Sequence, residues 1–202
     1  PTLGTINIHA SLLPQYRGAA PINWAIINGE KQTGVTSFII NEVIDTGNIL
    51  LQKSVPIDED ETAGTLHDKL QESGSQLLLE TLKLLESGEQ KGISQNTLFI
   101  DEKDLKPAPK IFKQTCKINW DNTAKDVNNA IRGFSPYPGA WTILQKGDEK
   151  FVFKIFSAKI INESHCLQSG TIVLKNNTIQ IAVRDWFISP IEIQIEGKKR
   201  MF

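Results

Sequence analysis

The stretch Thr5–Pro14 constrains the fold of this chain more than any other part of the sequence. Polar and apolar residues alternate through its first half, which predicts a strand with Asn7 and His9 on the same face. The strand breaks at residues 11–14, a stiff and largely apolar loop. In open α/β sheets, ligands bind beyond the carboxyl ends of the strands, where this loop would lie. An Asn beside a His at such a place indicates an oxyanion donor next to a proton carrier, although a structural pair at a strand end fits the pattern equally well.

The elements that follow predict a βαβ unit. Pro21 suits the first position of a helix, Gly29 suits the position just after its end, and residues 34–40 have the pattern of a buried strand. Strand, helix and strand in this order predict two parallel strands, whose carboxyl ends share one edge of the sheet. Asp45 follows the second strand and is therefore expected near His9, where its carboxylate would orient the imidazole and stabilise its charged form. The alternative is that Asp45 belongs only to a turn, because Asp and Gly are turn residues.

A further strand and a long helix complete the predicted front domain, residues 1–92. The strand covers residues 48–56, and the helix ends near Gly88. Its predicted buried stripe consists of leucines: Leu66, Leu70, Leu77, Leu78, Leu82 and Leu85. Residues 93–112 lose any clear period and include the stiff Lys106–Lys110 segment, which predicts a linker.

The back domain, residues 113–202, carries strand signals through most of its length. Five short strands are predicted between Trp141 and Ile195, which favours a small OB-like barrel, a fold that commonly binds oligonucleotides. Residues 110–202 hold 14 Lys and Arg against 8 Asp and Glu, a net charge of +6, whereas residues 1–109 hold 8 against 15, a net charge of −7. The contrast predicts two modules with different partners, unless the charges are segregated by chance. His165 is expected in a solvated hairpin loop.

Composition narrows the classes of protein that remain. No apolar run has the length of a membrane span, and the first residues do not have the pattern of a signal peptide. The two cysteines, Cys116 and Cys166, have no metal-binding spacing and form no disulfide framework. These features favour a reducing cytoplasm as the location of the protein.

Several motifs, in order along the whole chain, resemble the folate-dependent formyltransferases, and most closely those that act on methionyl-tRNA. In the front domain these motifs are Asn7–His9, Ser11–Ile22 and Asp45–Gly47. In the linker and the back domain they are Ala108–Ile111, Ile118–Trp120 and Arg132–Trp141. Each piece alone is weak, but the combination is highly specific. The resemblance implies part of a Rossmann-like α/β formyltransferase catalytic domain, followed by a small OB-like β-barrel domain.

The resemblance also implies the chemistry of the site. Asn7, His9 and Asp45 would be catalytic, and the tetrahydrofolate site would be lined by Ser11, Leu12, Leu13 and Pro14. The co-substrate would be 10-formyltetrahydrofolate, and the acceptor would be the α-amine of initiator methionyl-tRNA, formylated for translation initiation. The reaction requires no metal, and we expect neither a membrane nor an obligate protein partner.

Two departures from the family pattern lead to a further expectation. The Rossmann-like portion that precedes the Asn7 strand in the family is missing, and the chain stops at Phe202, short of the family's usual C-terminus. We therefore expect the Asn7 strand to be internal in the whole enzyme. We also expect these 202 residues alone to be inactive, and either to self-associate through the exposed edge or to exist only with a compensating partner. Two other functions stay open, namely formyl transfer to a sugar-nucleotide amine and RNA binding by the β module on an inert α/β scaffold.

Overall fold

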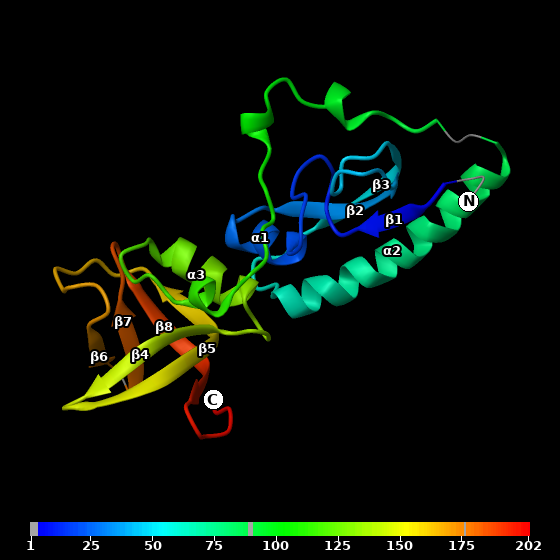
Figure 1. The fold of residues 1–202 in the computed structure, drawn as a ribbon. Helices are drawn as coiled ribbons and strands as arrows, with labels where there is room; N and C mark the ends of the chain where they lie inside the picture. The colour runs from blue at the N-terminus through cyan, green and yellow to red at the C-terminus, as the bar shows by residue number, and fades with distance from the viewer. Residues whose placement is uncertain (1–3, 89–90, 176) are drawn as a thin grey trace. The chain divides into compact units, whose positions relative to one another are not determined.

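The computed structural model describes residues 4–88, 91–175 and 177–202, and the chain divides into two units (Figure 1). The first unit comprises residues 1–25, 30–61 and 65–111. The second comprises residues 26–29, 62–64 and 112–202. The residues predicted to be catalytic all belong to the first unit.

The first unit contains a three-stranded sheet of order β1-β2-β3, made by β1 (Ile6–His9), β2 (Gln32–Ile39) and β3 (Ile49–Pro56). Both strand pairs are antiparallel, so the predicted parallel βαβ unit is wrong. The connection after β1 contains α1 (Pro21–Ile27), which is only seven residues long. Its loop stays at the carboxyl end of β1, where the Leu13 backbone N–H donates to the Thr36 hydroxyl at 3.2 Å. The chain therefore enters β2 at that end and runs back along β1.

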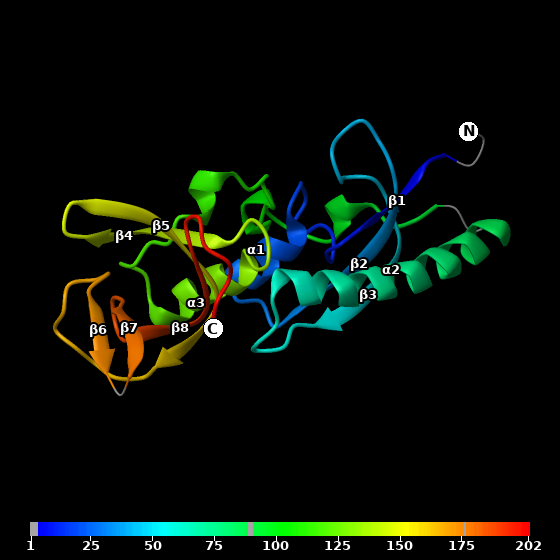
Figure 2. The same cartoon turned by 90° about the horizontal axis from the view of Figure 1, so that it is seen from below.

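The long helix α2 (Ala63–Glu86) lies along this sheet (Figures 1 and 2). Thr81 Oγ1 on the helix donates to Ser37 Oγ on β2 at 2.8 Å. The predicted leucine stripe is partly wrong, because the side chains of Leu78 and Leu82 are 37% and 44% exposed. The buried residues of the helix are instead Ala63, Leu66, Leu70, Ser73, Gly74, Leu77 and Thr81. Ser73 and Thr81 thus lie on the buried face of the helix, where a pattern based on leucines does not detect them.

The segment predicted to be a linker folds against the first unit. It contains two short 3₁₀ helices, η1 (Gln95–Thr97) and η2 (Glu102–Asp104). Beyond them, Gly18 and Ala108 form a parallel bridge, and the Tyr16 N–H donates to the Lys106 carbonyl at 2.7 Å. This segment therefore joins the loop that follows β1.

The second unit is a five-stranded antiparallel sheet of order β4-β5-β8-β7-β6, curled into a half-barrel, as the OB-like prediction requires (Figure 1). Its strands are β4 (Ala140–Lys146), β5 (Glu149–Ile161), β6 (Ile172–Lys175), β7 (Thr178–Ala182) and β8 (Phe187–Ile195). A short 3₁₀ helix, η3 (Lys113–Cys116), precedes α3 (Ala124–Gly133), and α3 packs against β5 and β8. The five predicted strands are all present.

His165 departs from the prediction of a solvated loop residue. Its Nε2 donates to the Trp186 carbonyl at 2.7 Å, and its ring lies 4.4 Å from the ring of Phe187. The ring is held because it satisfies a backbone acceptor on one side and packs on an aromatic face on the other. Across the described ranges, no helix combines the length and the apolar character needed to cross a membrane.

Candidate active site

His9 is the last residue of β1, and its side chain is 7% exposed. Its Nε2 lies 2.8 Å from the carbonyl oxygen of Tyr16. A carbonyl only accepts, so Nε2 carries a hydrogen and the lone pair of the neutral ring is on Nδ1. Tyr16 turns its carbonyl toward the ring from a left-handed backbone conformation, with φ of 61°. The loop after β1 therefore sets the tautomer of the histidine at its end.

Asp45 faces the other nitrogen of this ring. Its Oδ2 lies 3.6 Å from His9 Nδ1, and the Asp45 side chain is 13% exposed. The same oxygen accepts a hydrogen bond from the Gly18 backbone N–H at 2.9 Å. The carboxylate therefore lies where it stabilises a proton on Nδ1. The predicted proximity of Asp45 and His9 is observed, although the parallel topology from which it was predicted is not.

Asn7 lies two residues before His9 on the same strand, so the two side chains project from one face of β1. Asn7 is exposed, whereas His9 is buried. The face thus combines an exposed amide donor with an imidazole that can carry a proton beside a carboxylate. Such a set can stabilise an oxyanion and move a proton. Among the described residues, no group of three or more His, Cys, Asp and Glu side chains is placed to hold a metal ion.

The loop predicted to line a folate site is fixed to the sheet by two side chains. Thr36 Oγ1 donates to the Ser11 carbonyl at 2.6 Å, and Gln52 Nε2 donates to the Leu13 carbonyl at 2.8 Å. Ser11, Leu13 and Pro14 are buried, and Leu12 is half-buried. The Ser11 hydroxyl donates within the loop, to the Gln15 carbonyl at 2.7 Å. A ligand would therefore meet this loop through its backbone and Leu12 rather than through the Ser11 hydroxyl.

Comparison with known proteins decides the family of this chain. Residues 1–82 match the model described as formyl transferase, and residues 110–202 match the formyl transferase C-terminal domain. The chain belongs to the formyl transferase family. The antiparallel strand that carries Asn7 and His9 is therefore part of a formyl transferase domain, and the curled sheet is that family's C-terminal domain.

Curated relatives in this family are close in sequence over the whole chain. A methionyl-tRNA formyltransferase of Flavobacterium johnsoniae is 47% identical, and one of Azobacteroides pseudotrichonymphae is 51% identical. The matches cover 100% of this chain but only 62% and 63% of those relatives, so the chain spans less than two thirds of their length. A solved N-formyltransferase of Helicobacter canadensis, in complex with folinic acid and dTDP-3-aminofucose, superposes with a TM-score of 0.67 at 25% identity. That match covers 92% of this chain and 65% of the other.

Gln95 and Arg17 are the site residues that sequence reasoning missed. The Gln95 side chain is buried and donates from Nε2 to the carbonyls of Asp45 and Gly47, at 2.9 and 2.8 Å. Its Oε1 accepts two hydrogen bonds from Arg17. Burial lowers the pKa of the Arg17 guanidinium, and the carboxylates of Glu102 and Asp45 oppose this shift. No periodic pattern marks Gln95, because it lies in a segment without regular hydrophobic spacing.

The position of Gly47 leaves no room for a side chain, which explains why the Asp45–Gly47 motif ends in glycine. A Cβ on this residue would lie 1.6 Å from the Ile39 carbonyl oxygen, so a side chain cannot be accommodated there. The absence of a side chain lets the backbone after Asp45 pass close to the end of β2. A turn signal in the sequence predicts such a glycine, but not this close approach.

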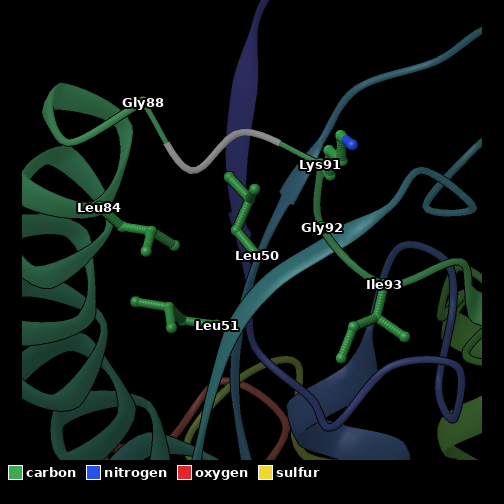
Figure 3. A pocket seen from close by; sticks show the side chains of 7 residues that line it. All are labelled: Leu50, Leu51, Leu84, Gly88, Lys91, Gly92 and Ile93. Atoms are coloured by element: carbon green, nitrogen blue, oxygen red, sulfur yellow. The ribbon is translucent and has the colours of Figure 1, made fainter.

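A pocket of about 550 Å³ lies elsewhere in the first unit (Figure 3). It lies between the end of α2, the start of β3 and the segment that follows residue 90. Its lining is mostly apolar and consists of Leu50, Leu51, Leu84, Gly88, Lys91, Gly92 and Ile93. None of the predicted site residues lines it, so it is separate from the arrangement around His9.

Proposed function

We propose that this chain carries the active site of an enzyme that transfers the formyl group of 10-formyltetrahydrofolate to the α-amine of initiator methionyl-tRNA. The observation that carries the proposal is the buried His9 on the strand that also bears Asn7, with its Nδ1 3.6 Å from the Asp45 carboxylate. It occurs in a chain 47% and 51% identical to enzymes named methionyl-tRNA formyltransferase. Folinic acid in a solved relative supports a folate as the co-substrate.

Each residue of the proposed trio has a distinct role. The amine of the acceptor attacks the formyl carbon, and the carbonyl oxygen becomes an oxyanion. Asn7 and protonated His9 donate hydrogen bonds to that oxyanion, and Asp45 stabilises the imidazolium. The bond from the formyl carbon to N10 of the folate then breaks, and the proton lost by the amine compensates the charge that develops on N10. The transfer requires no metal.

The hydrogen bonds of His9 indicate which of its nitrogens acts. Nε2 is engaged by the Tyr16 carbonyl at 2.8 Å, so Nδ1 is the nitrogen that would present a proton to substrate. At 3.6 Å from Asp45 Oδ2, Nδ1 gains charge stabilisation without a short hydrogen bond. A proton on Nδ1 therefore remains available to a developing oxyanion.

The second unit is proposed to bind the tRNA, in the cytoplasm. Residues 112–202 of this unit hold 13 Lys and Arg against 8 Asp and Glu, a net charge of +5, which favours a polyanion. Lys113 and Lys117 are exposed, and their ammonium groups lie 5.8 and 5.9 Å from the centre of the Trp141 ring. We propose that these two lysines contact phosphates.

The alternative acceptor is a sugar-nucleotide amine. It is supported by the Helicobacter canadensis relative, whose structure holds dTDP-3-aminofucose, but that protein is only 25% identical to this chain. The relatives named for methionyl-tRNA are 47% and 51% identical, which favours the tRNA as acceptor. RNA binding on an inert scaffold is less well supported, because such a scaffold has no need of a carboxylate facing a buried histidine.

Three substitutions in the proposed trio test the function. In the protein at the full length that its source encodes, Asn7→Ala and His9→Ala should each lower kcat by roughly 100- to 1,000-fold, because each removes a donor to the oxyanion. Asp45→Asn should also lower kcat with the fold intact, because Asn tolerates the φ of 54° at this position. The measurement is formyl transfer from 10-formyltetrahydrofolate to methionyl-tRNA.

The control is His67→Ala, which removes a histidine that is 60% exposed on α2. It should leave the rate unchanged. Normal turnover in all three trio variants would exclude this site. Transfer to dTDP-3-aminofucose but not to methionyl-tRNA would assign the enzyme to the alternative acceptor.

A further inference from the structure

We propose that Gln95 is a positioning residue that holds the Asp45 carboxylate against His9. The inference rests on the proposed function, because it assumes that Asp45 takes part in formyl transfer. Gln95 lies 50 residues after Asp45 in sequence, in η1. The segment that sequence reasoning treats as a linker would thus contribute to the active site.

The side-chain amide of Gln95 uses both of its N–H donors and both acceptor positions of its oxygen. Nε2 donates to the carbonyls of Asp45 and Gly47, at 2.9 and 2.8 Å. Oε1 accepts from Arg17 Nε at 3.0 Å and from Arg17 Nη2 at 2.7 Å. The Gln95 side chain is 1% exposed, so water cannot replace these partners without the segment moving. A buried amide with four hydrogen bonds fixes the groups on both of its sides.

These bonds close a ring that includes the carboxylate itself. Arg17 is bonded covalently to Gly18, whose N–H donates to Asp45 Oδ2 at 2.9 Å. Gln95 bonds to Arg17 on one side and to the Asp45 carbonyl on the other. The backbone and the carboxylate of Asp45 are therefore held through the same pair of residues.

The conformation of Asp45 requires such support. Its φ of 54° lies in the left-handed region, which non-glycine residues adopt at a cost in free energy unless neighbouring groups hold them there. Asp45 lies between β2 and β3 and belongs to neither strand. Without the two Gln95 N–H donors, the carbonyls of Asp45 and Gly47 lose the partners that fix this turn. The carboxylate would then no longer be held 3.6 Å from His9 Nδ1.

The test compares Gln95→Glu with Gln15→Leu in the protein at its full encoded length. Gln95→Glu keeps the size of the side chain and an acceptor for Arg17, but it removes both N–H donors. Gln15 also joins the loop after β1 to the later segment, donating to the Asp104 carbonyl and accepting from the Lys106 N–H, but it has no bond to Asp45. Gln15→Leu is therefore the matched control, because it weakens the contact between the loop after β1 and the segment around Lys106 without affecting Asp45.

We expect Gln95→Glu to lower kcat by roughly 10- to 100-fold with KM for both substrates changed by less than about 3-fold, because a misplaced group loses rate rather than binding. Gln15→Leu should leave kcat within about 2-fold of the parent. The decisive measurement repeats Gln95→Glu in an Asp45→Asn background, where the charged carboxylate is already absent. There the same change should lower kcat by less than about 2-fold.

Each other outcome overturns the inference. If Gln95→Glu lowers kcat by the same factor with and without the Asp45 carboxylate, Gln95 is only structural. If it leaves kcat unchanged while Asp45→Asn lowers it, the positioning role is wrong and the proposed function stands. If Asp45→Asn itself has no effect, the proposed role of Asp45 fails first. Should Gln95→Glu not fold, as judged by circular dichroism, Arg17→Lys removes the second donor to Oε1 and must show the same dependence on Asp45.

Discussion

At the scale of single residues, the site depends on buried polar groups that have partners. Thr36 is fully buried, and its hydroxyl donates to the Ser11 carbonyl while accepting from the Leu13 N–H and from Gln52. Thr33 is on the same strand and is also buried, but its hydroxyl has no partner among the described residues. The two threonines therefore have opposite expected responses to the same substitution.

We predict that Thr36→Val lowers the free energy of unfolding by about 1–3 kcal/mol, because it leaves a buried N–H and a buried carbonyl without partners. It should also raise KM for the folate, since the Ser11–Pro14 loop would no longer be attached to β2 through this hydroxyl. Thr33→Val should be neutral or stabilising, because it replaces an unpaired buried hydroxyl with a methyl group. Urea unfolding and steady-state kinetics measure both effects, and equal destabilisation by the two variants would contradict the prediction.

At the scale of elements, the sequence predicted where strands and helices lie, but it did not predict the relative direction of the strands in the first unit. Alternation and capping residues predicted the strand at Asn7, the helix at Pro21 and the five strands of the second unit. They could not distinguish an antiparallel return from a parallel crossover, because strand direction is set by where the loop is anchored. That anchor is Thr36, whose hydroxyl in a buried strand carries no periodic signal.

His9 and Asp45 lie close together with antiparallel strands as well, because β1 is short. Ile39, at the end of β2, pairs with Ile6, and His9 lies three residues further along β1, about 10 Å away. Six residues of extended chain span up to about 20 Å, so residues 40–45 reach back to the histidine. Asn7, His9 and Asp45 could be recognised from the sequence. The hydrogen bonds of Gln95 to the turn that carries Asp45 could not, because they are tertiary contacts.

The corrected stripe of α2 gives a prediction at the same scale. Leu77 is 1% exposed, whereas Leu79, on the same helix, is 62% exposed. Leu77→Ala should lower the free energy of unfolding by about 2–5 kcal/mol, because less apolar surface is buried and a cavity remains. Leu79→Ala should change it by less than about 0.5 kcal/mol. Denaturant unfolding of both variants measures the difference, and similar destabilisation by both would show that the face of α2 bearing Leu79 is covered in solution.

Glu30 links three segments of the first unit and predicts a dependence on pH. Its Oε1 accepts from the Tyr16 hydroxyl at 2.6 Å and pairs with Lys106 at 2.5 Å. Burial alone would raise the pKa of Glu30, but the hydrogen bonds from Lys106 and Tyr16 and the charge of Lys106 lower it below 4.5. A lowered folded-state pKa means that the stabilisation is present above pH 4.5 and is lost as pH falls through the folded value.

We therefore expect the difference in Tm between the parent and Glu30→Gln to be constant from pH 7 to pH 5 and to shrink as the pH falls below 4.5. Glu80→Gln, which changes an exposed carboxylate of α2, is the control and should show no such trend. Thermal unfolding followed by circular dichroism at each pH measures the difference. If the difference in Tm instead grew as the pH fell, the Glu30 carboxylate would not be stabilised by its pairing with Lys106, and the prediction would be contradicted.

At the scale of the whole molecule, the contrast in charge between the two halves was visible in sequence, but the role of each cation was not. Arg200 belongs to the basic C-terminal residues, yet its guanidinium lies 3.6 Å from the centre of the Phe156 ring and donates to the Pro136 carbonyl. It is therefore held by the fold of the second unit, and its reversal would disturb that fold. Lys113 and Lys117, which are exposed beside Trp141, are better probes of tRNA binding.

Reversal of these two lysines tests whether the second unit contacts tRNA. In the protein at its full encoded length, Lys113→Glu with Lys117→Glu should weaken tRNA binding and reduce the slope of log Kd against log salt by about 1 for each phosphate that is no longer neutralised. Lys31→Glu with Lys83→Glu changes the net charge by the same amount, but on exposed lysines of the acidic half. This control should keep the slope of the parent, because counterion release depends on local phosphate neutralisation rather than on total charge. Equal flattening by both pairs would show that long-range charge, and not a surface of the second unit, attracts the tRNA.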